Sequence, residues 1–318
     1  MYDVIIIGGG PAGLTAELYA VQKGLQALLI SPDLGGKTNY RLALPWINDP
    51  IHGGPGVLRG MEMVNYVRSE LEWLSMNSLV DVVESIQPGE NGFVVVTRGQ
   101  NETQKRQELL TKAVIVATGT HQVPLNVPGE KEYFLRGVGY SAFSYGPLFR
   151  DRVVAVVGEG ELAIRSAAEL ATVARQVYFI CSHTEMLAIP LGARLAALQN
   201  VEILDGYQVV EIKGGEELDE EFARSLLLRN PSGQLEEREV DGIFIERGLV
   251  PNSDIVSHLV YTSPAGYIHV DSRNCTNQPG IFAAGDVTDL YAENLLVALG
   301  EGAKAALSTY DYLLPRLI

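Results

Sequence analysis

The sequence predicts an α/β protein built from two nested βαβ folds, of which the second is inserted into the first. Three stretches of the 318-residue chain support this prediction. A strand, a G-x-G-x-x-G turn and a helix open the chain at residues 2–23, and a similar strand, turn and helix recur at residues 152–174. The third stretch, G-I-F-A-A-G-D at residues 280–286, returns the chain to the first fold.

The first βαβ unit starts with residues 2–7, a β-branched apolar run that is too short for a helix and suits a strand buried on both faces. An apolar-periodic helix is expected from Pro11 to Lys23, because Gly24 stops it. Residues 27–30 form the second strand. This order of elements is typical of a dinucleotide-binding fold.

Each glycine of the first turn has its own role in such a fold. Gly8 permits the tight turn, Gly10 lets the backbone approach a pyrophosphate, and Gly13 lets helix and strand pack closely. The phosphates would lie at the positive N-terminus of the helix. An acidic residue usually ends the second strand and binds a ribose; here Ser31 stands there, so Ser31 or Asp33 is the candidate. The alternative is an ordinary βα turn.

The rest of the first fold is less regular. Residues 39–60 contain several Gly and Pro and predict a long functional loop. A helix follows at 61–76, and strands at 79–86 and 92–98 are expected to form a hairpin. Residues 113–117 read as another buried strand.

The second unit begins with a strand at 152–157 and a G-x-G-x-x-A turn at 158–163. A helix is expected at 164–174 and the next strand at 177–180. The remaining expected elements are strands at 242–245 and 280–284 and a final helix at 293–313. These elements predict one domain from residues 1–119 and 246–318, and an inserted domain from residues 120–245.

The composition of the chain indicates which classes of binding partner are expected and where in the cell the protein is expected. The formal net charge is −15 and no Lys/Arg cluster is present, so neither nucleic acid nor an anionic membrane surface is expected as a partner. No apolar stretch is long enough to span a membrane, and the chain opens directly with a core strand, so the expected location is the cytoplasm. The two cysteines and five histidines have no metal-ligand spacing, so no metal is expected.

Taken together, the two glycine motifs, the A-T-G at residues 117–119, the G-I-F-A-A-G-D and the chain length resemble the low-molecular-weight thioredoxin reductases. These are FAD flavoproteins of the pyridine nucleotide-disulfide oxidoreductase superfamily, with two Rossmann-like domains. The resemblance covers the whole chain and implies an enzyme, an FAD-containing oxidoreductase that forms a homodimer. The FAD-binding residues it implies are Gly8, Gly10, Pro11, Ala12, Gly13, Ser31, Asp33, Gly36, Lys37, Thr118, Gly119, Gly285, Asp286, Asn294 and Leu295.

The first departure from that family concerns the redox disulfide. Thioredoxin reductases carry a C-A-T-C motif, because reduction of a disulfide needs a thiolate nucleophile and a resolving thiol. Alignment on Gly137-Val138 and Phe149 places Ser141 and Ser144 at the two cysteine positions. Serine has no comparable redox chemistry, so dithiol exchange at this site is excluded.

The second departure concerns the nicotinamide site. The 2′-phosphate of NADPH needs arginines after the second strand of the inserted unit, and residues 181–185 contain neither an arginine nor a suitably placed acid for NAD. Glu159 and Glu161 add negative charge where a pyrophosphate would lie. The second dinucleotide-like site, Gly158, Gly160, Glu161 and Ala163, is therefore expected to use NADPH poorly.

These departures resemble a branch of thioredoxin-reductase-like flavoproteins from photosynthetic and anaerobic bacteria. Members of this cyanobacterial-type branch take electrons from ferredoxin or hold a second FAD in the nicotinamide pocket. The favoured interpretation is an FAD-dependent electron-transfer oxidoreductase without a redox disulfide, with ferredoxin as a candidate donor. The alternatives are an NAD(P)H-dependent flavin or ferredoxin reductase and a non-catalytic flavin-binding redox sensor. Because ferredoxins are usually acidic, the charge of −15 argues against electrostatic steering toward them.

Overall fold

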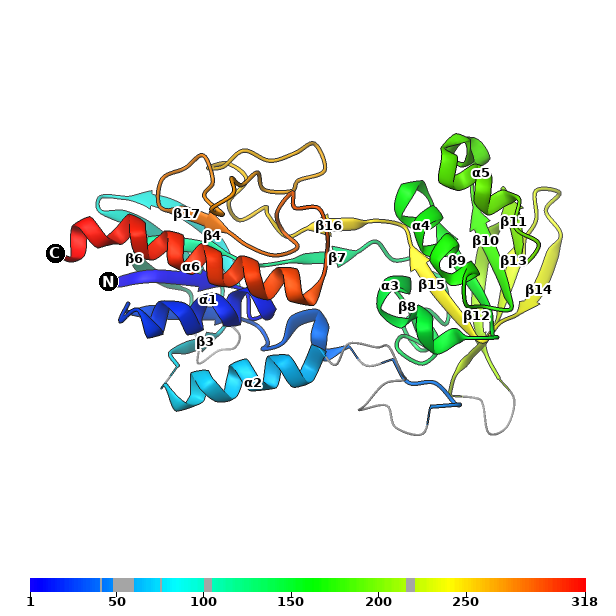
Figure 1. Cartoon of the computed structure of the whole chain (residues 1–318), viewed down its shortest axis with the longest axis horizontal. Helices are drawn as coiled ribbons and strands as arrows, with labels where there is room; N and C mark the ends of the chain where they lie inside the picture. Colours follow the sequence, from blue (N-terminus) through cyan, green and yellow to red (C-terminus); the bar gives the residue numbers. More distant parts are fainter. Residues whose placement is uncertain (41, 48–59, 75, 100–104, 216–220) are drawn as a thin grey trace. The chain divides into compact units, whose positions relative to one another are not determined.

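A computed structural model describes the chain except for residues 41, 48–59, 75, 100–104 and 216–220. Most of the predicted loop at 39–60 therefore lies outside the described residues. The chain forms two compact units (Figure 1). Unit 1 consists of residues 1–39, 60–121 and 250–318, and unit 2 of residues 40–59 and 122–249. The sequence predicts an FAD-binding domain at 1–119 with 246–318 and an inserted domain at 120–245. These assignments to cofactors stay a prediction.

Unit 1 is built on a seven-stranded mixed sheet. Its order is β3 (Ser78–Val80), β2 (Ala27–Ser31), β1 (Tyr2–Ile7), β6 (Gln107–Val116), β5 (Gly92–Thr97) and β4 (Val83–Gly89), with β17 (Ile281–Ala283) also paired to β6. The long strand β6 does two things. Its first half pairs antiparallel with β5, and its second half lies parallel between β1 and β17.

Helices α1 (Pro11–Gln22), α2 (Gly60–Trp73) and α6 (Leu295–Leu317), with the short 3-10 helix η1 (Gly36–Asn39), complete the regular structure of unit 1. Figure 1 shows α6 running along α1. A Cβ on Gly302 would lie 2.0 Å from the Ala12 carbonyl oxygen, so only glycine permits this approach. Alternate β1 side chains, such as Ile5 and Ile6, enter two different cores, as expected of a strand buried on both faces.

The prediction of one strand at 79–86 was wrong, because the strand is interrupted at residues 81 and 82 and the chain moves from one edge of the sheet to the other. β3 ends at Val80 and β4 starts at Val83. Between them the buried carboxylate of Asp81 accepts hydrogen bonds from the backbone N–H groups of Val82, at 2.7 Å, and Gly99, at 3.0 Å. A buried aspartate that binds backbone N–H groups favours a turn over a continuous strand. The hairpin itself, β4 with β5, is present.

Unit 2 contains a five-stranded parallel sheet, with order β11 (Val201–Asp205), β10 (Gln176–Cys181), β9 (Val153–Gly158), β15 (Gly242–Glu246) and β8 (Val138–Gly139). A separate antiparallel sheet contains β12 (Gln208–Gly214), β13 (Ala223–Arg229) and β14 (Leu235–Glu239). The helices are α3 (Ala142–Tyr145), η2 (Gly146–Phe149), α4 (Gly160–Ala171), η3 (Thr184–Ala188) and α5 (Pro190–Ala196). Strands β7 (Thr120–Gln122) and β16 (Leu249–Pro251) pair where the chain passes between the units.

Two helix boundaries differ from the prediction. α4 starts at Gly160, four residues earlier than expected, because the glycine turn leads directly into the helix. α6 starts at Leu295 and not at 293, since the Asn294 side chain accepts a hydrogen bond from the Leu296 N–H at 2.9 Å and caps the helix. Together the two units give the α/β architecture with parallel sheets that the sequence predicts.

Candidate functional site

The first glycine turn lies where β1 ends and α1 begins, in unit 1. A Cβ on Gly8, whose φ is +110°, would lie 2.2 Å from the Ala117 carbonyl oxygen, and one on Gly13 would lie 1.8 Å from the Gly8 carbonyl oxygen. Both positions therefore need glycine for packing. A Cβ on Gly10 would meet no atom within 4 Å. The backbone at Gly10 thus borders open space, as an approach to a pyrophosphate requires.

The N-terminus of α1 is suited to an anion. Its N-cap residue, Gly10, offers no side-chain cap, Pro11 starts the helix, and the first turn holds no acidic residue. The partial positive charge of the helix end is therefore not neutralised by the chain itself. Ala12 has a different part: it is buried, and its backbone packs against Gly302 of α6. These residues fit a bound pyrophosphate.

The predicted ribose contacts hold the following loop against the glycine turn. The buried Ser31 hydroxyl accepts a hydrogen bond from the Gly9 N–H at 2.8 Å. The exposed Asp33 carboxylate accepts one from the Gly36 N–H at 3.1 Å. The Gly35 N–H donates to the Gly9 carbonyl at 2.7 Å. Ser31 and Asp33 therefore stabilise the turn and the loop that follows it through these hydrogen bonds. A contact of either residue with a ribose stays a prediction.

The A-T-G segment is held in place by hydrogen bonds to Asn252, a residue that the sequence analysis did not predict. Asn252 donates from its amide to the Thr118 carbonyl at 2.9 Å, and its N–H donates to the Gly119 carbonyl at 2.9 Å. The Thr118 hydroxyl donates back to the Asn252 carbonyl at 2.7 Å. A Cβ on Gly119, at φ +65°, would meet no atom within 4 Å, so this segment also borders open space.

Lys37 joins three stretches of unit 1 that are far apart in the sequence. Its Nζ lies 3.0 Å from Asp286 Oδ2 and 3.3 Å from Glu293 Oε2, and it donates to the Thr120 hydroxyl. Burial, and then the charge of Asp286, raise the pKa of Glu293, against the opposing effect of Lys37. Burial, and the charges of Glu293 and Asp286, raise the pKa of Tyr267. The four residues Lys37, Thr120, Asp286 and Glu293 are called the Lys37 cluster below.

The remaining predicted residues of the first site are next to this cluster in the sequence. Gly285, at φ +77°, precedes Asp286, and a Cβ there would lie 3.0 Å from the Cβ of Ala12. Asn294 caps α6 and Leu295 is its first residue. Glu293 was not among the predicted site residues, although its place before the cap of the helix that follows Asp286 was a usable signal.

The second glycine motif, in unit 2, also leads from a strand into a helix, but its turn has other backbone angles and the opposite electrostatics. A Cβ on Gly158 would lie 2.0 Å from the Glu246 carbonyl oxygen, and buried Ala163 packs against that glycine. Gly160, at φ +79°, borders open space. However, Glu159 is the N-cap of α4 and Glu161 lies in its first turn, and both are exposed. These carboxylates occupy the positive helix end that a pyrophosphate would use.

The acidic character extends to the end of β10. Burial raises the pKa of the Cys181 thiol to about 11, and the charges of Asp205 and Glu159 add to this effect. Cys181 is therefore a neutral thiol near a negative edge.

Ser141 and Ser144 come together in unit 2 at the start of α3. Their hydroxyl oxygens lie 3.0 Å apart, and Ser141 accepts a hydrogen bond from the Ser144 N–H at 3.3 Å as the helix N-cap. The pair thus has helix-capping geometry and no sulfur. The cysteines of the chain, Cys181 and Cys275, lie in different units.

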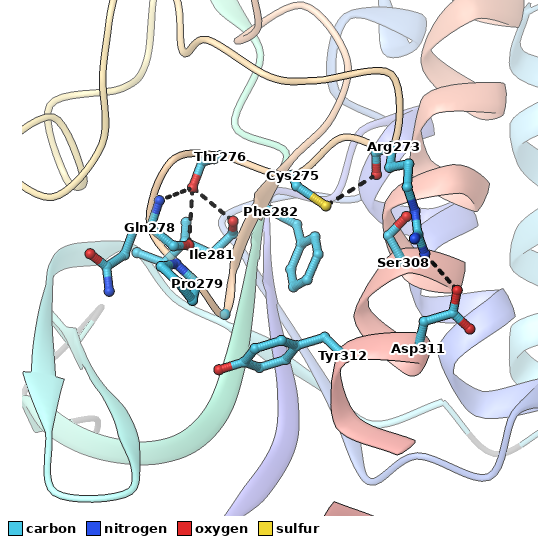
Figure 2. Close-up of a pocket in the computed structure, with 11 residues that line it drawn as sticks. Arg273, Cys275, Thr276, Gln278, Pro279, Ile281, Phe282, Ser308, Asp311 and Tyr312 are labelled. Carbon is cyan, nitrogen blue, oxygen red and sulfur yellow. Dashed lines mark hydrogen bonds and ion pairs between the residues drawn. The ribbon is translucent and has the colours of Figure 1, made fainter. Parts of the chain in front are cut away.

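A pocket of about 260 Å³ lies elsewhere in unit 1, at the end of the sheet where β17 begins (Figure 2). Figure 2 shows Arg273 paired with Asp311, at 2.6 Å, and the Cys275 thiol directed to the Arg273 carbonyl. The predicted dinucleotide residues follow the other ends of the strands. Within the described part of the chain no group of three His, Cys, Asp or Glu could hold a metal ion. Among the described helices, none is long and apolar enough to cross a membrane.

Comparison with known proteins agrees with this geometry. The model of the pyridine nucleotide-disulphide oxidoreductase family matches residues 2–302. The F component of alkyl hydroperoxide reductase from Xanthomonas campestris pv. phaseoli is 32% identical over 317 residues, which are 98% of this chain and 57% of that protein. An NADH dehydrogenase from Ferdinandcohnia aciditolerans is 31% identical over 98% of this chain and 58% of its own length. The chain thus spans little more than half the length of these relatives.

A solved structure covers the chain almost completely. The thioredoxin reductase from Streptococcus pyogenes superimposes with a TM-score of 0.83, at 32% identity, over 99% of both chains. Its likeness confirms the predicted fold class, two Rossmann-like folds with parallel sheets. The chain therefore belongs to the pyridine nucleotide-disulphide oxidoreductase family, and within it is a thioredoxin-reductase-like oxidoreductase of a flavin-binding kind.

Proposed function

We propose that the protein is an FAD-dependent electron-transfer oxidoreductase that works without a redox-active disulfide. The observation that carries this proposal is the Ser141–Ser144 pair, with hydroxyl oxygens 3.0 Å apart at the start of α3. Hydroxyl groups at this spacing cannot form a disulfide or take part in thiol exchange. The chemistry would then rest on the bound flavin, which transfers electrons, while the chain binds and tunes it.

The FAD would lie along the open backbone of unit 1. Gly10 and the uncapped N-terminus of α1 would hold the pyrophosphate, and Gly119 leaves room on the neighbouring strand end. Asp286 follows β17 at the same edge of the sheet. This placement agrees with the general rule that ligands of such sheets bind beyond the carboxyl ends of the strands.

The electrostatics of unit 2 favour a donor other than NADPH. Glu159 and Glu161 lie at the end of α4 that would receive a pyrophosphate, and Asp205 adds a third negative charge at the neighbouring strand end. A dinucleotide phosphate would lose affinity through this repulsion. We therefore infer that a protein such as ferredoxin is the donor. A second FAD in unit 2 is a weaker form of the proposal, since its pyrophosphate would meet the same carboxylates.

A second candidate function is an NAD(P)H-dependent reductase. The backbone at Gly160 borders open space as Gly10 does, and one relative is named an NADH dehydrogenase. The third candidate is a flavin-binding redox sensor without catalytic turnover.

Anaerobic stopped-flow spectroscopy of the purified flavoprotein separates the three. Bleaching of the flavin band by reduced ferredoxin but not by NADH or NADPH is the expected result. Rapid bleaching by NADH or NADPH would refute the first proposal in favour of the second candidate, and no bleaching by any donor would favour the sensor. Flavin counted after denaturation tests the second FAD, which a ratio of one flavin per chain would exclude.

A further inference from the structure

The Lys37 cluster contains one more carboxylate than it has cations. Lys37 Nζ contacts both Asp286, at 3.0 Å, and Glu293, at 3.3 Å, so a single positive charge serves two negative ones. The hydroxyl of Thr120 also bonds to Lys37 and is neutral. Tyr267, another titratable group that the charge of Glu293 affects, is a phenol whose own pKa is raised. With both carboxylates ionised, the cluster carries one negative charge.

The two carboxylates differ in their access to water. The Asp286 side chain is 19% exposed and has the shorter contact with Lys37. The Glu293 side chain is 30% exposed, has the longer contact, and lies just before the cap of α6. Glu293 is therefore the member of the pair that can exchange a proton with solvent more directly. Burial and Asp286 already hold its pKa above that of an ordinary glutamate.

The Lys37 cluster lies close to the backbone that would bind the pyrophosphate of a dinucleotide. A Cβ on Gly36, the residue before Lys37, would lie 3.2 Å from the Gly10 Cα, beside the open backbone that fits a pyrophosphate. Thr120 follows the A-T-G segment and Asp286 follows β17. The cluster thus lies at the edge of the sheet formed by the carboxyl ends of the strands, where ligands of such folds bind.

We propose that the Glu293 carboxylate takes up a proton when a bound flavin is reduced, and that Lys37 positions Glu293 for this exchange. The inference rests on the proposed function, because it needs a flavin in unit 1. A bound flavin would supply the two-electron chemistry and would take one proton from solvent; the second proton of the two-electron reduction would bind the Glu293 carboxylate, at the side turned away from Lys37. The driving force is the negative charge added beside a cluster in which, among the described residues, one lysine contacts two carboxylates.

Potentiometric titration of the flavoprotein at a series of pH values tests this step. By linkage, wild-type protein should bind about one proton more per two electrons than the E293Q variant, in the range where Glu293 is ionised before reduction. The K37Q variant should move that range to higher pH, because the lysine stabilises the ionised carboxylate. The E108Q variant, which changes an exposed glutamate on β6, is the matched control and should keep the wild-type slope.

Equal proton uptake by wild type and E293Q, with flavin bound to both, would overturn the inference and leave the proposed function intact. A wild-type chain that binds no flavin would overturn the proposed function. Infrared difference spectra of the wild type give a second readout that does not depend on the variant retaining FAD. A protonated carboxyl band that appears on reduction supports the step, and the lack of one refutes it.

Discussion

The buried side chain of Glu17 allows a test of how burial changes the pKa of a carboxyl group and the stability of the protein. It lies on α1 and its side chain is fully buried. Neither carboxylate oxygen has a hydrogen-bond partner among the described residues. Burial raises its pKa from the ordinary value of 4.5 to about 8, against a smaller opposing effect of the Asn77 backbone. At neutral pH the folded protein therefore holds Glu17 as a neutral acid, while the unfolded chain ionises it.

The sign and size of the effect follow from linkage. Between pH 4.5 and 8 the folded state binds the proton and the unfolded state has lost it, so the free energy of unfolding falls as pH rises. Each pH unit of this window costs about 1.4 kcal/mol, which gives a ceiling of about 3 kcal/mol at pH 7. The E17Q variant has no such titration. Its advantage over the wild type should be close to zero near pH 4.5 and should grow to roughly 3 kcal/mol at pH 7.

Urea denaturation of the wild type and E17Q at matched pH values measures this difference, with FAD held at one concentration because a ligand of the folded state shifts both curves. Subtracting the two stability profiles removes the titration of distant groups. A stability difference that stays constant from pH 5 to pH 8 would show that Glu17 does not change its proton affinity on folding. An E17Q variant less stable than the wild type at pH 8 would refute the reasoning as well.

Three further predictions concern the glycine turn, the serine pair and a buried carboxylate. Gly13→Ala should lower the free energy of unfolding by about 3 kcal/mol or more, because the new Cβ would overlap a backbone oxygen. Gly10→Ala should fold normally and bind FAD roughly tenfold more weakly. Circular dichroism melts measure the first effect and flavin titration measures the second. The double variant Ser141→Cys, Ser144→Cys should form a disulfide and lose two titratable thiols on oxidation, while the wild type keeps its two. Glu130→Gln should lower stability by about 1–3 kcal/mol in thermal or urea melts, because the buried carboxylate accepts two backbone N–H groups and a tyrosine hydroxyl; an unchanged midpoint would contradict this role.

The sequence predicts best where one local rule decides the structure. The strand at 2–7 follows directly from an apolar run and is confirmed. The need for glycine at Gly8 and Gly13 follows from turn sterics and agrees with their close backbone contacts, while the role of the turn toward a dinucleotide stays a prediction. The break in the strand at Asp81 was missed because its cause includes a hydrogen bond from the Gly99 N–H, which is remote in the sequence. Single-sequence patterns carry no information on such pairings.

The same limit applies to the site. Lys37 and Asp286 were expected from the family resemblance, and each lies in the cluster. Asn252 was not expected, and Glu293 was interpreted as an exposed residue at a helix start, because each depends on a partner more than a hundred residues away in the chain. Residue type alone could not tell an exposed glutamate at a helix start from one that shares a lysine.

The split of unit 1 along the chain has a consequence for how the protein is made. β17, at residues 281–283, fills a place beside β6, at residues 107–116, and α6 packs on α1 only after that. During synthesis unit 2 is complete by residue 249, whereas the sheet of unit 1 waits for β17, at residues 281–283, to leave the ribosome. Until then one side of the second half of β6, at residues 114–116, is an open edge that can pair with other chains. Newly made protein should therefore depend on chaperones until the final segment of unit 1, residues 250–318, has emerged, and only then can Asp286 pair with Lys37.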